Sequence, residues 1–290
     1  MGLKIFPFLI CFSLIATEKL ELQREDSSEL ICYCDLPSKA PFPITLILPG
    51  SQKETSLRTH NSLKNDLLKI NSCVLTLEKR GVSEGKVDDK EFVEHLSLTD
   101  RFEDHLLVLT QLENGLIPGW NGKISLLGQG DGGRIGAKIA ATNTNISALI
   151  LIAAGGGWTP LQEALYSFRS EMVDQGYSPQ YIHGFLVKAR QEFAQAQELP
   201  KAKHIAFGYS YKYWDSLINT HLIEDLAKLK CPIYSVNGIK DDRVPIESVD
   251  EMAKYLKDKV TFIRKEKMGR EIIQDHEIYE EAISWLEKSL

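Results

Sequence analysis

The stretch Ile124–Ala137 constrains the fold of this chain more than any other. A β-branched and leucine-rich run passes through small residues directly into a helical pattern, which predicts a buried strand joined to a helix by a sharp turn. Glycines at Gly128 and Gly132 would let the strand and the helix approach closely. The residue midway between them, Gly130, is expected at the tip of the turn, in a strained and outward-pointing conformation.

The rest of the chain predicts a sheet built around this strand. Buried strands are indicated by apolar runs at 44–48, 73–77, 146–152, 232–238 and 261–263. Helical patterns separate them at 57–70 and 99–112, and a last helix is expected at 278–290. This alternation predicts an α/β fold with a mostly parallel, doubly wound sheet. Residues 19–24 and 29–36 alternate apolar with polar side chains, as an N-terminal antiparallel hairpin would.

Composition and net charge limit the classes of function that we expect for this chain. With 290 residues, of which 43% are hydrophobic, the chain can bury a large core as one domain. Its net charge is −6 and it has no long basic run, so no nucleic-acid partner is expected.

Residues 1–16 resemble a secretory signal peptide, with Lys4 before a short apolar stretch that ends at Ala16. Export to the periplasm or the medium is expected, with no stable membrane span once the signal is removed. An uncleaved anchor or a buried first strand are the alternatives. Export would allow disulfides among Cys32, Cys34, Cys73 and Cys231, although buried free thiols in strands fit the pattern better.

The segment 158–230 interrupts the strand–helix alternation. It is expected to be helical and to form a cap inserted over an α/β core made of 17–157 and 231–290. Its many aromatic residues favour an apolar pocket over a sugar or nucleotide site.

Three turns, in this order and spacing, resemble the α/β-hydrolase family. They are Pro49-Gly50-Ser51, Glu78-Lys79-Arg80-Gly81 and Gly128-Gln129-Gly130-Asp131-Gly132-Gly133. The likeness is to the esterase, thioesterase and peptidase-like branch whose elbow reads Gly-x-Ser-Glu-Gly-Gly. This resemblance implies an α/β-hydrolase fold with an inserted helical cap, and a triad that uses neither a metal nor an organic cofactor.

The resemblance also assigns the site residues. Gly130 falls at the nucleophile position, and Asp241 is placed as the acid by the loop Gly238–Pro245, with Asp242 as its competitor. His276, just before the last helix, is expected to be the base. The backbone N–H groups of Ser51 and Asp131 would form the oxyanion hole.

Gly130 departs from the family pattern because glycine has no oxygen to acylate. Three explanations stay open. The chain is a natural pseudoenzyme that kept its pocket, or a hydrolase whose serine at position 130 was replaced, or a protein in which another group acts. That group would be the carboxylate of Asp131 or a water activated by His276. The expected function is therefore an ester or thioester hydrolase type with little or no turnover. The alternative is a binding protein for an acyl or lipid-like ligand with an apolar part.

Overall fold

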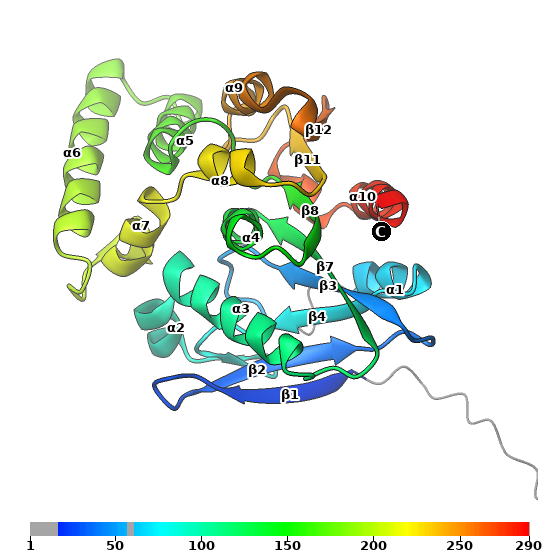
Figure 1. Cartoon of the computed structure of the whole chain (residues 1–290). Helices are drawn as coiled ribbons and strands as arrows, with labels where there is room; N and C mark the ends of the chain where they lie inside the picture. The colour runs from blue at the N-terminus through cyan, green and yellow to red at the C-terminus, as the bar shows by residue number, and fades with distance from the viewer. Residues whose placement is uncertain (1–16, 57–60, 290) are drawn as a thin grey trace, which may run out of the picture.

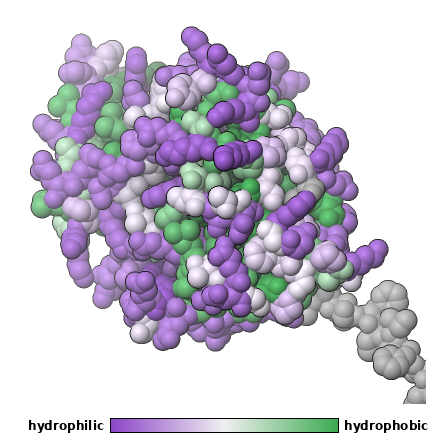
Figure 2. Space-filling model, in the orientation of Figure 1, coloured by the Kyte–Doolittle hydropathy of each residue, from purple (hydrophilic) through white to green (hydrophobic). Residues whose placement is uncertain are grey.

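A computed structural model describes residues 17–56 and 61–289 of the chain (Figure 1). The signal-peptide prediction for residues 1–16 lies outside this range, as does the first turn of the helix expected at 57–70. Among the described residues no helix is both long and apolar enough to cross a membrane. On the face shown in Figure 2, hydrophilic side chains are interspersed with smaller apolar areas.

An eight-stranded sheet forms the centre of the molecule, in the order β1-β2-β4-β3-β7-β8-β11-β12. Its strands are β1 (Glu18–Gln23), β2 (Glu29–Asp35), β3 (Phe42–Leu48), β4 (Cys73–Leu77), β7 (Trp120–Gln129), β8 (Ile146–Ile152), β11 (Ile233–Gly238) and β12 (Val260–Lys265). The pairs β1–β2 and β2–β4 are antiparallel, whereas the six strands from β4 to β12 run parallel. The predicted parallel sheet with an antiparallel N-terminal hairpin is therefore confirmed.

Helices cover both faces of the sheet (Figure 1). One face packs against α3 (Leu98–Glu113), α4 (Asp131–Thr142), α8 (Leu222–Lys228) and α9 (Ile246–Leu256). The other face packs against α1 (Asn61–Lys69) and α10 (His276–Ser289). The central parallel strands are buried on both faces. Their continuous apolar runs therefore contribute side chains to two hydrophobic cores, one on each face of the sheet.

Smaller elements complete the described chain. The helix α2 (Asp89–His95) follows a short hairpin of β5 (Val82–Ser83) and β6 (Lys86–Val87), and the 3-10 turns are η1 (Lys257–Lys259) and η2 (Arg270–Gln274). Cys32, Cys34 and Cys73 are buried free thiols, and Cys231 is a half-buried one.

The 158–230 segment connects β8 to β11. It contains α5 (Pro160–Asp174), α6 (Pro179–Glu198), α7 (Tyr211–Ile218) and α8. It is not helical throughout, since β9 (Ile205–Ala206) and β10 (Tyr209–Ser210) form a small antiparallel ladder. Phe168, Phe193, Phe207 and Trp214 pack around one another and hold its helices together. In Figure 1, α5, α6 and α7 lie together at one side of the sheet.

Candidate functional site

Gly130 stands at the junction between β7 and α4. The strand ends at Gln129 and the helix begins at Asp131, and Gly130 between them has φ 51° and ψ −124°. Its N–H donates to the carbonyl of Ile152 at the end of β8, at 2.9 Å. Close packing of the helix on the sheet requires glycine at Gly132, where a Cβ would lie 1.9 Å from the carbonyl oxygen of Leu48. The expected strand–turn–helix geometry, with Gly130 at its tip, is present.

Arg270 occupies the space in front of this tip. Its Nη2 atom lies 2.7 Å from the point where a Cβ on Gly130 would be. Its Nη1 atom donates to the carbonyl of Ala153 at 3.1 Å and lies 3.6 Å from Oδ2 of Asp241. The guanidinium therefore stands between the tip of the turn and Asp241. The sequence interpretation missed Arg270, although its place in the loop between β12 and α10 was the available signal.

Asp241 lies where it was expected, in the loop that follows β11. Its side chain is completely buried, and Oδ1 accepts hydrogen bonds from the backbone N–H groups of Arg243 (2.8 Å) and Val244 (3.0 Å). Among the described residues Oδ2 has no hydrogen-bond partner, and Arg270 is its nearest cation. Asp242, the alternative acid, is exposed and lines the cavity beside it.

His276 does not lie with the other predicted site residues. Its Nε2 atom is 3.3 Å from Oε1 of Glu280 and 3.8 Å from Oδ2 of Asp66, and its side chain is 49% exposed. Within the described part of the chain no contact joins it to Asp241, so the structure does not bring the predicted base and acid together, and a role for His276 as the base stays a prediction. The physical reason is that α10 packs beside α1, which turns the first residue of α10 toward Asp66 rather than toward the tip of the turn.

Ser51 and Asp131 are brought together by their side chains. The Ser51 hydroxyl and the Tyr213 hydroxyl (2.8 Å) both donate to Oδ2 of Asp131. Burial disfavours the charged carboxylate, but these two hydrogen bonds and the charges of Arg270 and Arg101 outweigh it, so the pKa of Asp131 is lowered. The site therefore holds a fixed negative charge beside Gly130. The oxyanion role of the two backbone N–H groups stays a prediction.

A cavity of about 600 Å³ opens over these residues. Its floor includes Gly50, Ser51, Gly130, Asp131, Ala153 and Arg270, which follow the carboxyl ends of β3, β7, β8 and β12. Its wall comes largely from the 158–230 segment and includes Phe168, Phe207, Tyr209, Tyr213, Trp214 and Leu217. The cavity thus combines a charged floor with an aromatic wall, as ligand sites in open α/β sheets commonly do.

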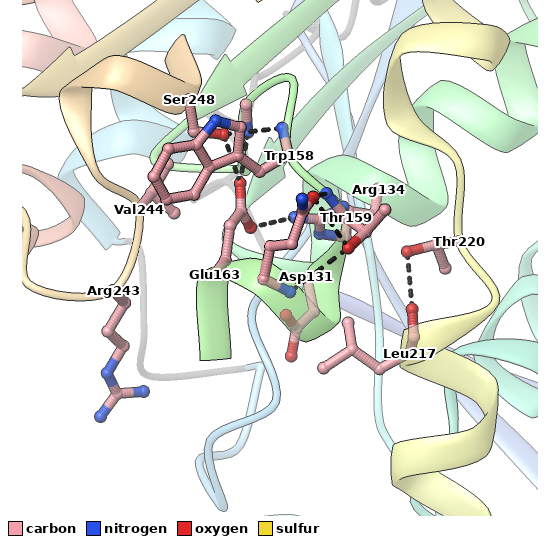
Figure 3. A network of polar contacts seen from close by, with 12 residues as sticks. Asp131, Arg134, Trp158, Thr159, Glu163, Leu217, Thr220, Arg243, Val244 and Ser248 are labelled. Atoms are coloured by element: carbon pink, nitrogen blue, oxygen red, sulfur yellow. Dashed lines mark hydrogen bonds and ion pairs between the residues drawn. The ribbon is translucent and has the colours of Figure 1, made fainter. Parts of the chain in front are cut away.

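A buried ion pair fixes one side of this cavity (Figure 3). Arg134 on α4 pairs with Glu163 on α5, and their side chains are only 4% and 7% exposed. Glu163 also accepts hydrogen bonds from the N–H of Gly156 and the hydroxyl of Ser248, both at 2.9 Å. Burial raises the pKa of Glu163 although Arg134 opposes this. The network joins α4, α5 and α9 around the end of β8.

Comparisons with known proteins find similar folds among solved structures. The chain matches no protein-family model. No curated protein is detectably similar in sequence. Solved structures do match. They include the 2,6-dihydroxy-pseudo-oxynicotine hydrolase, at TM-score 0.65 and 16% identity over 95% of this chain and 68% of that one. Est1E from Butyrivibrio proteoclasticus matches at TM-score 0.62 and 17% identity, over 93% and 96%. The Pyrococcus furiosus esterase PF2001 matches at TM-score 0.61 and 16% identity, over 95% and 91%. At such low identity these matches show the fold, and this chain has the α/β-hydrolase fold.

Proposed function

We propose that this α/β-hydrolase-fold chain has lost serine-hydrolase turnover and that its cavity binds a small molecule with an apolar part. One observation carries the proposal: the tip of the β7–α4 turn bears no side chain, and the guanidinium of Arg270 stands between that tip and Asp241. Structural similarity to esterases and other hydrolases supports an ancestry in ester or thioester hydrolysis.

Loss of turnover follows from the chemistry of the two residues. Glycine offers no nucleophile, and removal of a triad member costs several orders of magnitude in rate. An arginine stays protonated in proteins and has no acceptor, so Arg270 cannot serve as the general base. His276, the predicted base, lies beside Asp66 and Glu280 instead.

This geometry supports neither of two catalytic alternatives, a hydrolase whose serine at position 130 was replaced or a protein in which Asp131 is the nucleophile. If a serine at position 130 had simply been replaced, restoring it would still leave Arg270 where a base is needed. A nucleophilic role for Asp131 would require its carboxylate to leave the hydroxyls of Ser51 and Tyr213, and a base to hydrolyse the resulting ester. No histidine ring lines the cavity among the described residues.

The lining indicates the kind of ligand. Aromatic side chains from the 158–230 segment offer an apolar surface to an acyl chain or ring, while Arg270 and Arg243, which also line the cavity, can donate to a carbonyl or carboxylate oxygen. An ester, a thioester or a free acyl compound has both parts. Such a molecule would bind without being cleaved.

Two assays on the wild-type chain test this function. We expect no labelling by a fluorophosphonate probe and no hydrolysis of p-nitrophenyl esters above the buffer rate, with a serine esterase as positive control. We also expect a medium-chain acyl compound to change the fluorescence of Trp214, which lines the cavity. Trp214→Phe is the control for the origin of that signal. Turnover by the wild-type chain would overturn the proposed loss of activity.

We also propose that the chain is exported, because residues 1–16 resemble a secretory signal peptide. N-terminal sequencing of the protein recovered from the expressing cells tests it. Cleavage near Ala16 supports export, whereas an intact N-terminus in the cytosol contradicts it.

A further inference from the structure

Three potential metal ligands meet on the side of the sheet away from the 158–230 segment. They are Asp66 on α1 and the pair His276 and Glu280, one turn apart on α10. The helices α1 and α10 pack side by side over the second hydrophobic core (Figure 1). Since residues four apart share one face of a helix, His276 and Glu280 present their side chains together toward Asp66.

The distances within this cluster suit a small divalent ion. The Nε2 atom of His276 lies 3.3 Å from Oε1 of Glu280 and 3.8 Å from Oδ2 of Asp66, and all three ligand atoms lie within 4.8 Å of one another. Ligand atoms 2.0–2.1 Å from a tetrahedral zinc ion are separated by roughly 3.3 Å. Small rotations of the two exposed side chains, His276 and Glu280, would bring all three atoms to this spacing.

Asp66 supplies a second, independent observation. Its side chain is 12% exposed, and Oδ2 is buried without a hydrogen-bond partner among the described residues. Its other oxygen is held by Lys69 at 2.6 Å. A buried carboxylate oxygen that no donor satisfies carries a cost of desolvation, and a metal ion at the cluster would remove that cost.

We propose that Asp66, His276 and Glu280 bind one divalent transition-metal ion of the zinc class, which joins α1 to α10. One imidazole and two carboxylates suit such an ion, whereas Ca²⁺ and Mg²⁺ prefer oxygen ligands alone. Water would fill the remaining position. With a neutral imidazole, the two carboxylates and Lys69 leave a net charge of −1 around the site, which attracts a cation.

This metal site would give His276 a role that does not involve the cavity beside Gly130. Because the ligands lie on two helices that are held together only in the folded chain, the ion raises the thermal midpoint of unfolding.

Zinc titration of the full chain, free of any affinity tag and stripped with a chelator, tests the proposal. We expect one ion per chain and a higher thermal midpoint in the presence of zinc. His276→Ala, Asp66→Asn and Glu280→Gln should each weaken binding by about tenfold or more. His183→Ala and Glu277→Gln are matched controls, since both residues are exposed and lie outside the cluster.

Copper titration followed by electron paramagnetic resonance gives a readout that does not depend on stability. The wild-type spectrum should show coupling to one imidazole nitrogen, and His276→Ala should lose it. The proposal is overturned if His276→Ala binds zinc as tightly as the wild-type chain. It is equally overturned if zinc binding disappears in Cys231→Ser, because a thiol would then be the ligand.

Discussion

The Nη2 atom of Arg270 lies 2.7 Å from the point at which a Cβ on Gly130 would stand. These two residues are 140 positions apart in the sequence. Glycine at position 130 leaves the space that the Arg270 side chain occupies. A Cβ at position 130 would press on the Nη2 end of the guanidinium. The proposed loss of the nucleophile and the proposed loss of the base would therefore share one structural feature, the contact between Gly130 and Arg270.

Gly130→Ser alone should not create an esterase. The hydroxyl would meet a protonated guanidinium that cannot accept its proton. A non-glycine residue at φ 51° and ψ −124° also costs about 1–3 kcal/mol of stability. Fluorophosphonate labelling and p-nitrophenyl ester hydrolysis should both stay at the wild-type level.

The double variant Gly130→Ser with Arg270→His should gain labelling. The side chain at position 270 points between Gly130 and Asp241, since the Nη1 atom of Arg270 is 3.6 Å from Oδ2 of this buried acid. A histidine there is shorter than arginine, and its imidazole would lie on the path from Asp241 to the new serine once the loop moves inward. Arg270→His alone is the matched control and should remain unlabelled. If Gly130→Ser alone were labelled as fast as the double variant, Arg270 would not be the obstacle.

Breaking the buried pair between Arg134 and Glu163 should destabilise the chain strongly. Glu163→Gln would leave the guanidinium of Arg134 buried beside an amide donor, at a cost of about 3–5 kcal/mol. The same change in the exposed pair of Arg264 with Asp250, as Asp250→Asn, should cost less than about 1 kcal/mol. Urea unfolding measures both, and equal losses would show that burial of the pair does not matter.

The fold could be predicted because its signals are local. The run Ile146–Ile152 is continuously apolar, and such a run predicts a strand buried on both faces wherever it occurs. Gly130 and Asp241 could be placed for the same reason, since Gly130 directly follows β7, Asp241 lies in the loop after β11, and the carboxyl ends of parallel strands meet at one edge. By contrast, β9 and β10 are two residues each, too short to show a period.

The position of Arg270 in front of Gly130 could not be predicted because it depends on tertiary packing. Ten residues, Glu266–Asp275, separate β12 from α10, and the sequence does not say which of them reaches over the edge of the sheet. A search for histidine selects His276, but the packing of α10 on α1 turns that ring away. Arginine is not a base, so no search by residue type for catalytic groups would find Arg270.

The aromatic core of the 158–230 segment should determine whether this part of the chain stays folded. Phe193 is 1% exposed and packs against Phe168, Phe207 and Trp214. Phe193→Ala should cost about 3–5 kcal/mol in that cluster. Hydrogen exchange should then speed up in α6 and α7 while β7 and β8 keep their protection. Equal acceleration throughout the sheet would mean that the segment and the sheet unfold as one unit.

Lys79 should make the free energy of unfolding increase with pH above about pH 7. It is 6% exposed, and its Nζ donates to the carbonyl of Gly50 at 3.1 Å. Burial, helped by the charge of Arg101, lowers the pKa of Lys79 from 10.5 to about 7. Between these values the unfolded chain binds a proton that the folded chain does not, so the free energy of unfolding rises with pH. The slope from this group approaches about 1.4 kcal/mol per pH unit.

Urea unfolding of the wild-type chain and of Lys79→Met at several pH values from about 5.5 to 9.5 isolates this contribution. The wild-type free energy of unfolding, minus that of the variant, should increase steadily with pH, because the other titrating groups cancel in the difference. Below about pH 7 the difference should level off, since both states of the wild-type chain are then protonated at Lys79. Lys254→Met, at an exposed position of α9, provides the control for loss of one positive charge. A difference that stays flat from pH 7 to 9.5 would mean that Lys79 reaches solvent and is charged in the folded chain.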